Sequence, residues 1–389
     1  MTPAVSARAK ALVLPPFDVL NEKAALLRRR GHNVISLGQA VPGFGPPPAA
    51  IEAARRALSD PATHRYSADA GRLTLREALC DAFGREQAIV AQPDELIVTA
   101  GGNQAFMLAA MTLLDPGDDM LLVSPHFVNH AMAIQAVGAN AIDAPVSDRT
   151  TFSARWSDIA GRITARTRAV VLCTPSNPTG AVVPADALAR IVRELSSRGI
   201  VLVSDETYLH FVYGASHAGA ASVEGWRQNV VVVGTFSKSF GMTGWRAGYL
   251  LADAGFCTHA LKIQDAMVIC APVVSQIAAE AAVRDNWNYA HSFHSDIQMK
   301  RAVLEAGLAE IPCLERSTGG AGFFKFVRVD GCRDSMALAG DILEQVHVVT
   351  IPGATFGAAG EGFLRLSYGA ATVDQLTEAC GRLQNFFAR

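Results

Sequence analysis

Residues 235–251, TFSKSFGMTGWRAGYLL, place a lysine between two serines and an arginine eight positions later. Only six lysines occur among the 34 lysines and arginines of the chain, so Lys238 is not one of many similar charges. A lysine amine attacks carbonyl carbons, and a guanidinium such as that of Arg246 binds anions. The pattern therefore indicates a site that combines covalent attachment with anion binding.

Strand and helix patterns alternate on both sides of this segment. The runs typical of strands buried on both faces are 95–100, 120–124, 169–174, 200–206, 230–236 and 246–251. Helical patterns lie between them at 103–114 and 184–199. After about residue 285 we expect a long helix over 285–310, strands at 322–329 and 363–369, and a helix over 373–388.

This alternation predicts an α/β fold with a mostly parallel, doubly wound sheet flanked by helices. We expect a large cofactor-binding domain over 46–284. Residues 1–45 and 285–389 are expected to form a smaller α+β domain that closes over the substrate.

Polar side chains follow the predicted strands at the point where each strand ends. In open α/β sheets, ligands bind beyond these carboxyl ends. The candidates are the turn Gly101-Gly102-Asn103, Asn177 in PSNPTG, Asp205 and Tyr208 in DETY, and Ser237 with Lys238. Taken singly, each has an ordinary structural explanation: a glycine turn before a helix, an Asn-Pro turn, a helix N-cap.

Taken together, the set matches pyridoxal phosphate, which has an aldehyde, a protonated ring nitrogen, a phenolic oxygen and a phosphate. Lys238 would form a Schiff base, and Asp205 would pair with the pyridinium. Asn177 and Tyr208 would donate to the ring oxygen. The phosphate would be held by Arg246, Ser237 and the N–H groups of Gly102 and Asn103.

The motifs SNPTG, DETY and SKSFGMTGWRAGY carry a resemblance that extends from VISLGQAVPGF (34–44) to FLRLSYG (363–369). The chain resembles the fold-type I, pyridoxal-phosphate-dependent aminotransferases of class I/II. The resemblance implies that Arg365 binds the substrate α-carboxylate and that Phe127 stacks on the cofactor. It also implies a homodimer, in which Tyr66 reaches the phosphate of the partner subunit.

Three departures from the family pattern stand out. Ala40 occupies a position where glycine is common, and Phe127 replaces the more usual Trp or Tyr. Several polar residues also lie near the motifs, and we interpret them as hydrogen-bonded surface residues: His126, Asn129, His130 and His210. The HSFH segment (291–294) is interpreted as a helix face, and no metal site is expected.

The resemblance implies a ping-pong transamination between an L-amino acid and a 2-oxo acid, with Lys238 as the proton carrier. Family members build the side-chain pocket from the partner subunit and from five positions of the same chain. These positions are mostly apolar here, so we expect a neutral or aromatic substrate: Leu14, Pro16, Phe17, Ala40 and Val41. Asn177 also borders the substrate. The same apparatus also serves lyases, cyclases and oxygen-dependent oxidases, and the LGQ…P opening resembles transaminases that act as β-lyases. A non-catalytic sensor is a further alternative.

Composition narrows the class of protein. The formal net charge is −2, which gives no electrostatic case for nucleic acid or an anionic membrane. The seven cysteines are scattered and odd in number, which favours reduced thiols in the cytoplasm. No apolar run reaches the roughly 20 residues of a membrane helix, and no secretory signal is expected at the N-terminus.

Overall fold

Seven strands form the main sheet of the computed structural model, which describes residues 4–214 and 217–388. Their order across the sheet is β2-β8-β7-β6-β5-β3-β4. The strands are β2 (Leu96–Thr99), β3 (Asp119–Ser124), β4 (Asn140–Pro145), β5 (Thr167–Cys173), β6 (Val201–Asp205), β7 (Val230–Thr235) and β8 (Gly248–Leu251). Only β8 runs antiparallel to its neighbours, β2 and β7. The predicted α/β class and mostly parallel sheet are confirmed.

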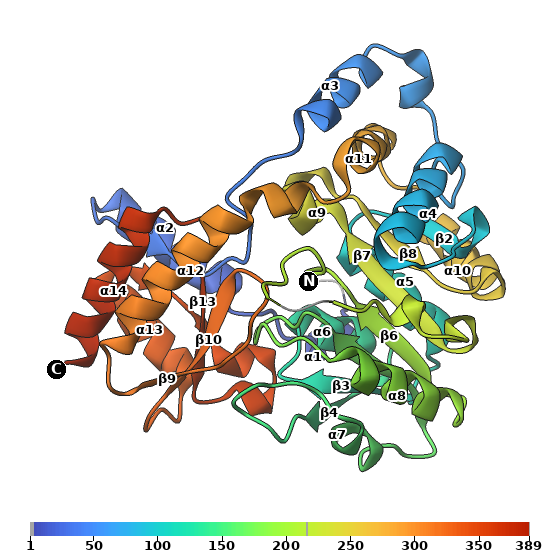
Figure 1. The fold of residues 1–389 in the computed structure, drawn as a ribbon. Coiled ribbons are helices and arrows are strands. Elements are labelled where there is room, and N and C mark those ends of the chain that lie inside the picture. The colour runs from blue at the N-terminus through green and yellow to red at the C-terminus, as the bar shows by residue number, and fades with distance from the viewer. Residues whose placement is uncertain (1–3, 215–216, 389) are drawn as a thin grey trace.

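Helices cover both faces of this sheet (Figure 1). The helices in this part of the chain are α3 (Pro48–Ala57), α4 (Leu73–Gln87), α5 (Gly102–Leu113), α6 (Val128–Ala136), α7 (Trp156–Ala160), α8 (Ala185–Ser196), α9 (Phe236–Ser239), α10 (Ala254–Val268) and α11 (Val273–Asn286). Helix α3 stands away from the sheet and packs on α11, as Figure 1 shows.

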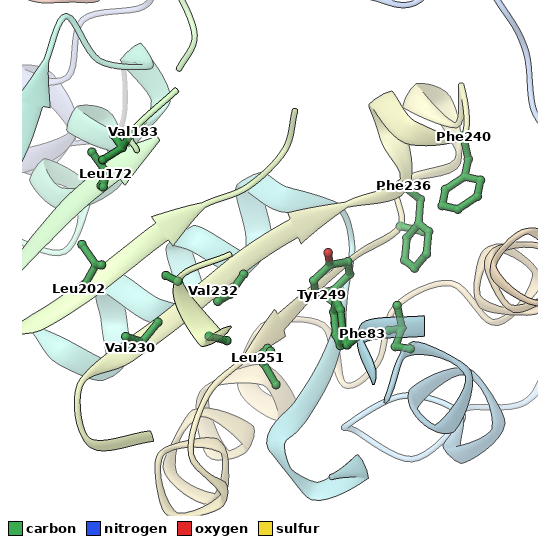
Figure 2. Close-up of a cluster of buried hydrophobic side chains, with 14 of the residues drawn as sticks. Phe83, Leu172, Val183, Leu202, Val230, Val232, Phe236, Phe240, Tyr249 and Leu251 are labelled. Carbon is green, nitrogen blue, oxygen red and sulfur yellow. The ribbon is translucent and has the colours of Figure 1, made fainter. Parts of the chain in front are cut away.

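Strand β7 shows why the strand sequences are apolar at successive positions. Val230 and Val232 belong to the core cluster on one face of the sheet (Figure 2), whereas Val231 and Val233 belong to the cluster on the other face. Each fully buried valine contributes about 1.5–3 kcal/mol relative to an exposed one. The strand is therefore fixed from both sides, and so is the position of its carboxyl end.

A smaller domain contains a four-stranded antiparallel sheet in the order β12-β13-β10-β9, and a two-stranded parallel pair, β1 with β11. Its elements come from both ends of the chain, and Figure 1 shows the N-terminal helix α2 (Phe17–Arg29) beside the C-terminal helices. They are α2, β1 (Ile35–Ser36), α12 (His294–Ala309), β9 (Leu314–Arg316), β10 (Phe324–Val329), α13 (Ser335–Val346), β11 (Val348–Val349), β12 (Ile351–Pro352), β13 (Phe363–Ser367) and α14 (Val373–Phe387). The short helix α1 (Ala7–Ala11) instead contacts α6, beside the main sheet.

The single helix predicted over 285–310 is wrong at its beginning. Helix α11 ends at Asn286, a 3-10 turn spans Tyr289–Phe293, and α12 begins at His294. The break is stabilised by aromatic packing, because the ring of Phe293 stacks on Phe44 with centroids 4.0 Å apart. The HSFH segment therefore lies across a turn and a helix start, and is not one helix face.

Candidate active site

A cavity of about 540 Å³ lies at the carboxyl ends of β5, β6 and β7. Its volume falls in the range of about 300–1,000 Å³ that is usual for small-molecule sites. The lining includes most of the predicted site residues: Phe17, Ala40, Gly102, Asn103, Phe127, Asn177, Asp205, Tyr208, Ser237, Lys238, Arg246 and Arg365. Strand β8 begins at the same edge of the sheet because it is antiparallel to β7, which places Arg246 beside Lys238.

Lys238 projects from the short helix α9, which directly follows β7. The side chain of Thr235 caps this helix by accepting from the backbone N–H of Ser237, and buried Phe236 and Phe240 anchor it (Figure 2). The amine of Lys238 donates to the carbonyl of Ala40 at 2.8 Å. Burial lowers the pKa of this amine to about 8, and the nearby cationic side chains act in the same direction. A larger fraction of the amine is therefore neutral and nucleophilic at neutral pH.

Asp205 is the last residue of β6 and is buried. Its Oδ1 accepts from the backbone N–H of Thr207 at 3.0 Å, and its Oδ2 lies 3.0 Å from Nε2 of His130. Burial alone would raise the pKa of this carboxyl, but the hydrogen bonds from His130 and Thr207 lower it below its ordinary value. Asp205 therefore remains a carboxylate inside the cavity.

Arg365 lies on β13 and is only 2% exposed. Its guanidinium donates to Oδ1 of Asn177 at 2.8 Å and to the carbonyl of Gly38 at 2.6 Å, and both acceptors are uncharged. Burial lowers its pKa to about 10, so it is still a cation at neutral pH. Within the described residues its Nε has no hydrogen-bond partner. A buried cation with neutral acceptors and a free donor favours an anionic ligand.

Tyr208 lies next to Asn177 and Arg365 and is also buried. Burial raises the pKa of its phenol, although the charge of Arg365 and a hydrogen bond with Asn177 oppose the shift. The phenol is therefore protonated at neutral pH and is available as a hydrogen-bond donor.

The turn before α5 is shaped around Arg246. Gly101 has φ +86°, and a Cβ added there would lie 2.5 Å from Nη2 of Arg246. The guanidinium itself donates to the carbonyl of Thr243 at 2.9 Å and to that of Ala100 at 3.4 Å. A cation beside the N-terminus of α5, which begins at Gly102, forms a suitable site for a phosphate.

The substitution Gly101→Ala should weaken binding of pyridoxal phosphate about tenfold, because the methyl group displaces the guanidinium of Arg246 and strains the backbone by about 1–3 kcal/mol. Equilibrium titration of the cofactor measures the change. Gly117→Ala is the matched control, since Gly117 has φ +92° but open space around its Cβ position. Equal affinities of the Gly101 and Gly117 variants would show that Arg246 does not depend on this glycine.

Some predicted positions lie outside the cavity lining. Tyr66 is 77% exposed, and Gly101 lies behind Arg246. Leu14 and Pro16 border a separate groove of about 740 Å³ instead of the site, because the N-terminal segment reaches the site only at Phe17.

The interpretation of the histidines as surface residues is wrong, because His126, His130 and His210 are all buried. His126 lies 3.1 Å from Asp143, and the ring of His130 stacks on Phe106 with centroids 4.1 Å apart while its Nε2 faces Asp205. His130 is the main functional candidate that the sequence interpretation missed. The available signal was its spacing of three residues from Phe127, which at the start of α6 brings the two rings to a centroid distance of 5.4 Å.

His210 packs between Trp287 and His291, with ring centroids 5.0 and 5.7 Å away. Neither of its ring nitrogens has a hydrogen-bond partner within the described residues. Burial lowers its pKa to about 3, and the neighbouring histidines 291, 217 and 294 act in the same direction. His210 is therefore neutral in the folded protein.

This burial predicts acid sensitivity. Below pH 6.5 the unfolded chain protonates His210 while the folded chain does not, so stability falls as the pH drops towards 3. At pH 5.5 the loss should be about 1.4 kcal/mol of unfolding free energy. His210→Phe should flatten this pH dependence in urea unfolding, whereas His259→Phe, on the surface of α10, should not. The same pH slope in both variants would contradict the assignment.

Comparisons with known proteins agree with this geometry. Residues 32–383 match the family described as aminotransferase class I and II. The aromatic-amino-acid aminotransferase 2 of Thermococcus litoralis is 32% identical over 356 residues, which cover 90% of this chain and 91% of that protein. The aspartate aminotransferase of Thermotoga maritima is 32% identical over 383 residues, covering 98% and 99%. The solved structure of aspartate aminotransferase from Thermus thermophilus with maleate has a TM-score of 0.92 at 30% identity, covering 99% of this chain and 100% of that one.

The chain belongs to the class I and II aminotransferases, and is a pyridoxal-phosphate-dependent enzyme of that family. The residues present fit the cofactor, since the cavity combines a lysine of lowered pKa, a buried carboxylate and an arginine at a helix N-terminus. Amino acids and 2-oxo acids are the substrates that the family implies. In the described part of the chain, no helix has the length and apolar character to cross a membrane.

Proposed function

We propose that this enzyme transfers the amino group of a neutral or aromatic L-amino acid to a 2-oxo acid by a ping-pong mechanism. The observation that supports the substrate class is the set of cations in the cavity. Among the described lining residues, the lysines and arginines are Lys238, Arg246 and Arg365, and the proposed mechanism uses all three. None of these three cations remains to bind a carboxylate in the side chain of an acidic substrate, while Phe17, Ala40 and Val41 offer apolar surface.

Each residue has a proposed role. Lys238 attaches the cofactor, Arg246, Ser237 and the N–H groups of Gly102 and Asn103 hold its phosphate, and Gly101 makes room for Arg246. Asp205 holds the proton on the ring nitrogen, Asn177 and Tyr208 donate to the ring oxygen, and Phe127 lies against the ring. Arg365 binds the substrate carboxylate, and Phe17, Ala40 and Asn177 border the substrate.

Lys238 also moves the proton in this proposal. When bound, the cofactor withdraws electrons from the α-carbon of the substrate and so acidifies its C–H bond. The amine of Lys238 would accept this proton at Nζ as a general base and later give it back as a general acid. The carbonyl of Ala40 is placed to orient the amine, because it already accepts a hydrogen bond from Nζ. Asp205 would stabilise a protonated ring nitrogen, and His130, whose Nε2 lies 3.0 Å from Oδ2, would hold this carboxylate in place.

The remaining parts of the proposal concern assembly. We propose that residues 46–284 form the cofactor-binding domain, and that 1–45 with 285–389 form the domain that closes over the substrate. The exposed ring of Tyr66 supports a homodimer in which this residue reaches the phosphate of the partner subunit. The location proposed is the cytoplasm, in line with seven free cysteines in the described residues.

Substrate competition tests the proposed class. With 2-oxoglutarate as acceptor, kcat/KM should be at least about tenfold higher for phenylalanine than for aspartate, a difference of about 1.4 kcal/mol. Arg365→Lys should lower both values together, because the α-carboxylate is common to both substrates, and leave their ratio unchanged. A preference for aspartate would contradict the proposed class and would require a cation beyond these three.

A further inference from the structure

Two glutamines are completely buried next to the loop of residues 66–72. Gln264 lies on α10 and Gln276 on α11, and both are 0% exposed, which is uncommon for this residue type. Gln276 accepts from the backbone N–H of Arg72 at 2.7 Å and donates to Oγ of Ser67 at 3.1 Å. Gln264 donates to the carbonyls of Val98 at 3.0 Å and Asp69 at 3.4 Å. The side chains of Gln264 and Gln276 thus hold the loop on its buried side.

The same loop presents an exposed tyrosine. The base of the loop is held close to β2, because Val98 donates to the carbonyl of Ala70 at 3.0 Å, and a Cβ on Gly71 would lie 2.5 Å from that of Val98. Tyr66, at the start of the loop, is nevertheless 77% exposed. This combination of a rigid base and an exposed ring suits a residue that acts outside its own chain.

Gln104 connects this loop to the cofactor turn. Its Oε1 accepts from the backbone N–H of Ala100, and its Nε2 donates to Oε1 of Gln264 at 2.7 Å. The carbonyl of Ala100 in turn accepts from Arg246. Both acceptors of the Gln264 amide nitrogen are carbonyls, so the orientation of this amide is fixed. A continuous series of hydrogen bonds therefore leads from Arg246 through Ala100, Gln104 and Gln264 to the Tyr66 loop.

We propose that Gln104 and Gln264 are positioning residues that make the phosphate-binding turn and the Tyr66 loop one unit. The proposal rests on the assignment of this turn to the cofactor phosphate. An anion that orders the turn through Arg246 also orders the loop, and by reciprocity an ordered loop favours binding at the turn. If Tyr66 reaches the phosphate of a partner subunit, occupancy of one site would also prepare the second site.

Hydrogen exchange of residues 66–72 tests this link. The measurement uses the full chain with Tyr66→Phe, so that a tyrosine hydroxyl cannot bind a phosphate and protect the loop directly. Addition of pyridoxal phosphate should slow exchange of the loop about tenfold. The further substitution Gln264→Leu should remove this protection and weaken cofactor binding about tenfold. Gln104→Leu should have the same two effects as Gln264→Leu. Because Gln104 is less buried than Gln264, this variant is the substitute if the Gln264→Leu protein does not fold.

Gln276→Leu is the matched control, since Gln276 is equally buried and holds the same loop, while its hydrogen bonds within residues 4–214 and 217–388 do not include Gln104. This variant should raise exchange of the loop without cofactor, yet keep the tenfold protection on cofactor addition. Equal protection in the Gln264 and Gln276 variants would overturn the proposal, as would no protection in Tyr66→Phe alone. Failure of the assigned cofactor site is distinguishable, because no visible absorbance would then develop at Lys238. Inorganic phosphate would then replace pyridoxal phosphate as the ligand added to the turn. The same hydrogen-exchange results would support or overturn the proposal.

Discussion

Replacement of Lys238 by alanine should lower kcat for transamination by about 10⁴-fold or more, the largest effect expected for a single residue. The substitution removes both the covalent attachment of the cofactor and the group that carries the α-proton. The turnover rate in the presence of excess cofactor measures the combined effect of losing the attachment and losing the proton carrier. A small primary amine added to the variant should restore part of the rate, because it can replace the lost proton carrier. Lys262→Ala, on the exposed face of α10, is the control and should retain full activity.

The pKa of Lys238 adds a pH signature to this prediction. Its pKa of about 8 means that most of the amine is protonated at pH 7 and most is neutral at pH 9. The rate at which the cofactor attaches should therefore rise with pH and level off above about 8. A K238A variant with more than a tenth of the parent activity, or an attachment rate independent of pH, would contradict the role given to this lysine.

Asp205→Asn should lower kcat by about 10³-fold while leaving the enzyme folded. The carboxylate is buried, and hydrogen bonds from His130 and Thr207 keep its pKa low, so it can stabilise a protonated ring nitrogen. The amide of asparagine has nearly the same shape but no charge. Steady-state kinetics with saturating cofactor separates the loss in kcat from weaker cofactor binding.

Asp143→Asn is the matched control for the charge at position 205. Asp143 lies on β4 of the same sheet and also faces a histidine, His126, but it does not line the cavity. Activity of this control should stay within about twofold of the parent. A similar loss in the two variants would assign the effect to stability and not to the ring proton.

The main sheet and most of the site could be predicted because their signals are local. Buried strands such as β7 are apolar at successive positions, and their carboxyl ends necessarily meet at one edge. Asp205 ends such a strand, and Asn177 and Lys238 lie within four residues of the end of one. The cavity could therefore be assembled from the sequence without knowledge of how the strands pair.

Other features depend on contacts between distant segments. The edge strand β4 has a mixed burial pattern and produces no continuous apolar run. His130 looks like a surface residue in sequence, and only the packing of α6 against the sheet brings it to Asp205. Gln104 and Gln264 are separated by 160 residues, and nothing in either segment indicates that their amides meet. Polar side chains buried by tertiary packing thus account for most of what the sequence interpretation missed.

The most direct test of transamination follows the nitrogen. The purified enzyme is incubated with ¹⁵N-labelled phenylalanine and unlabelled 2-oxoglutarate, and the products are analysed by mass spectrometry. We predict ¹⁵N-glutamate and phenylpyruvate in equal amounts, with no requirement for oxygen. Release of the label as ammonia, with glutamate unlabelled, would contradict amino-group transfer and would favour a lyase or an oxidase on the same site.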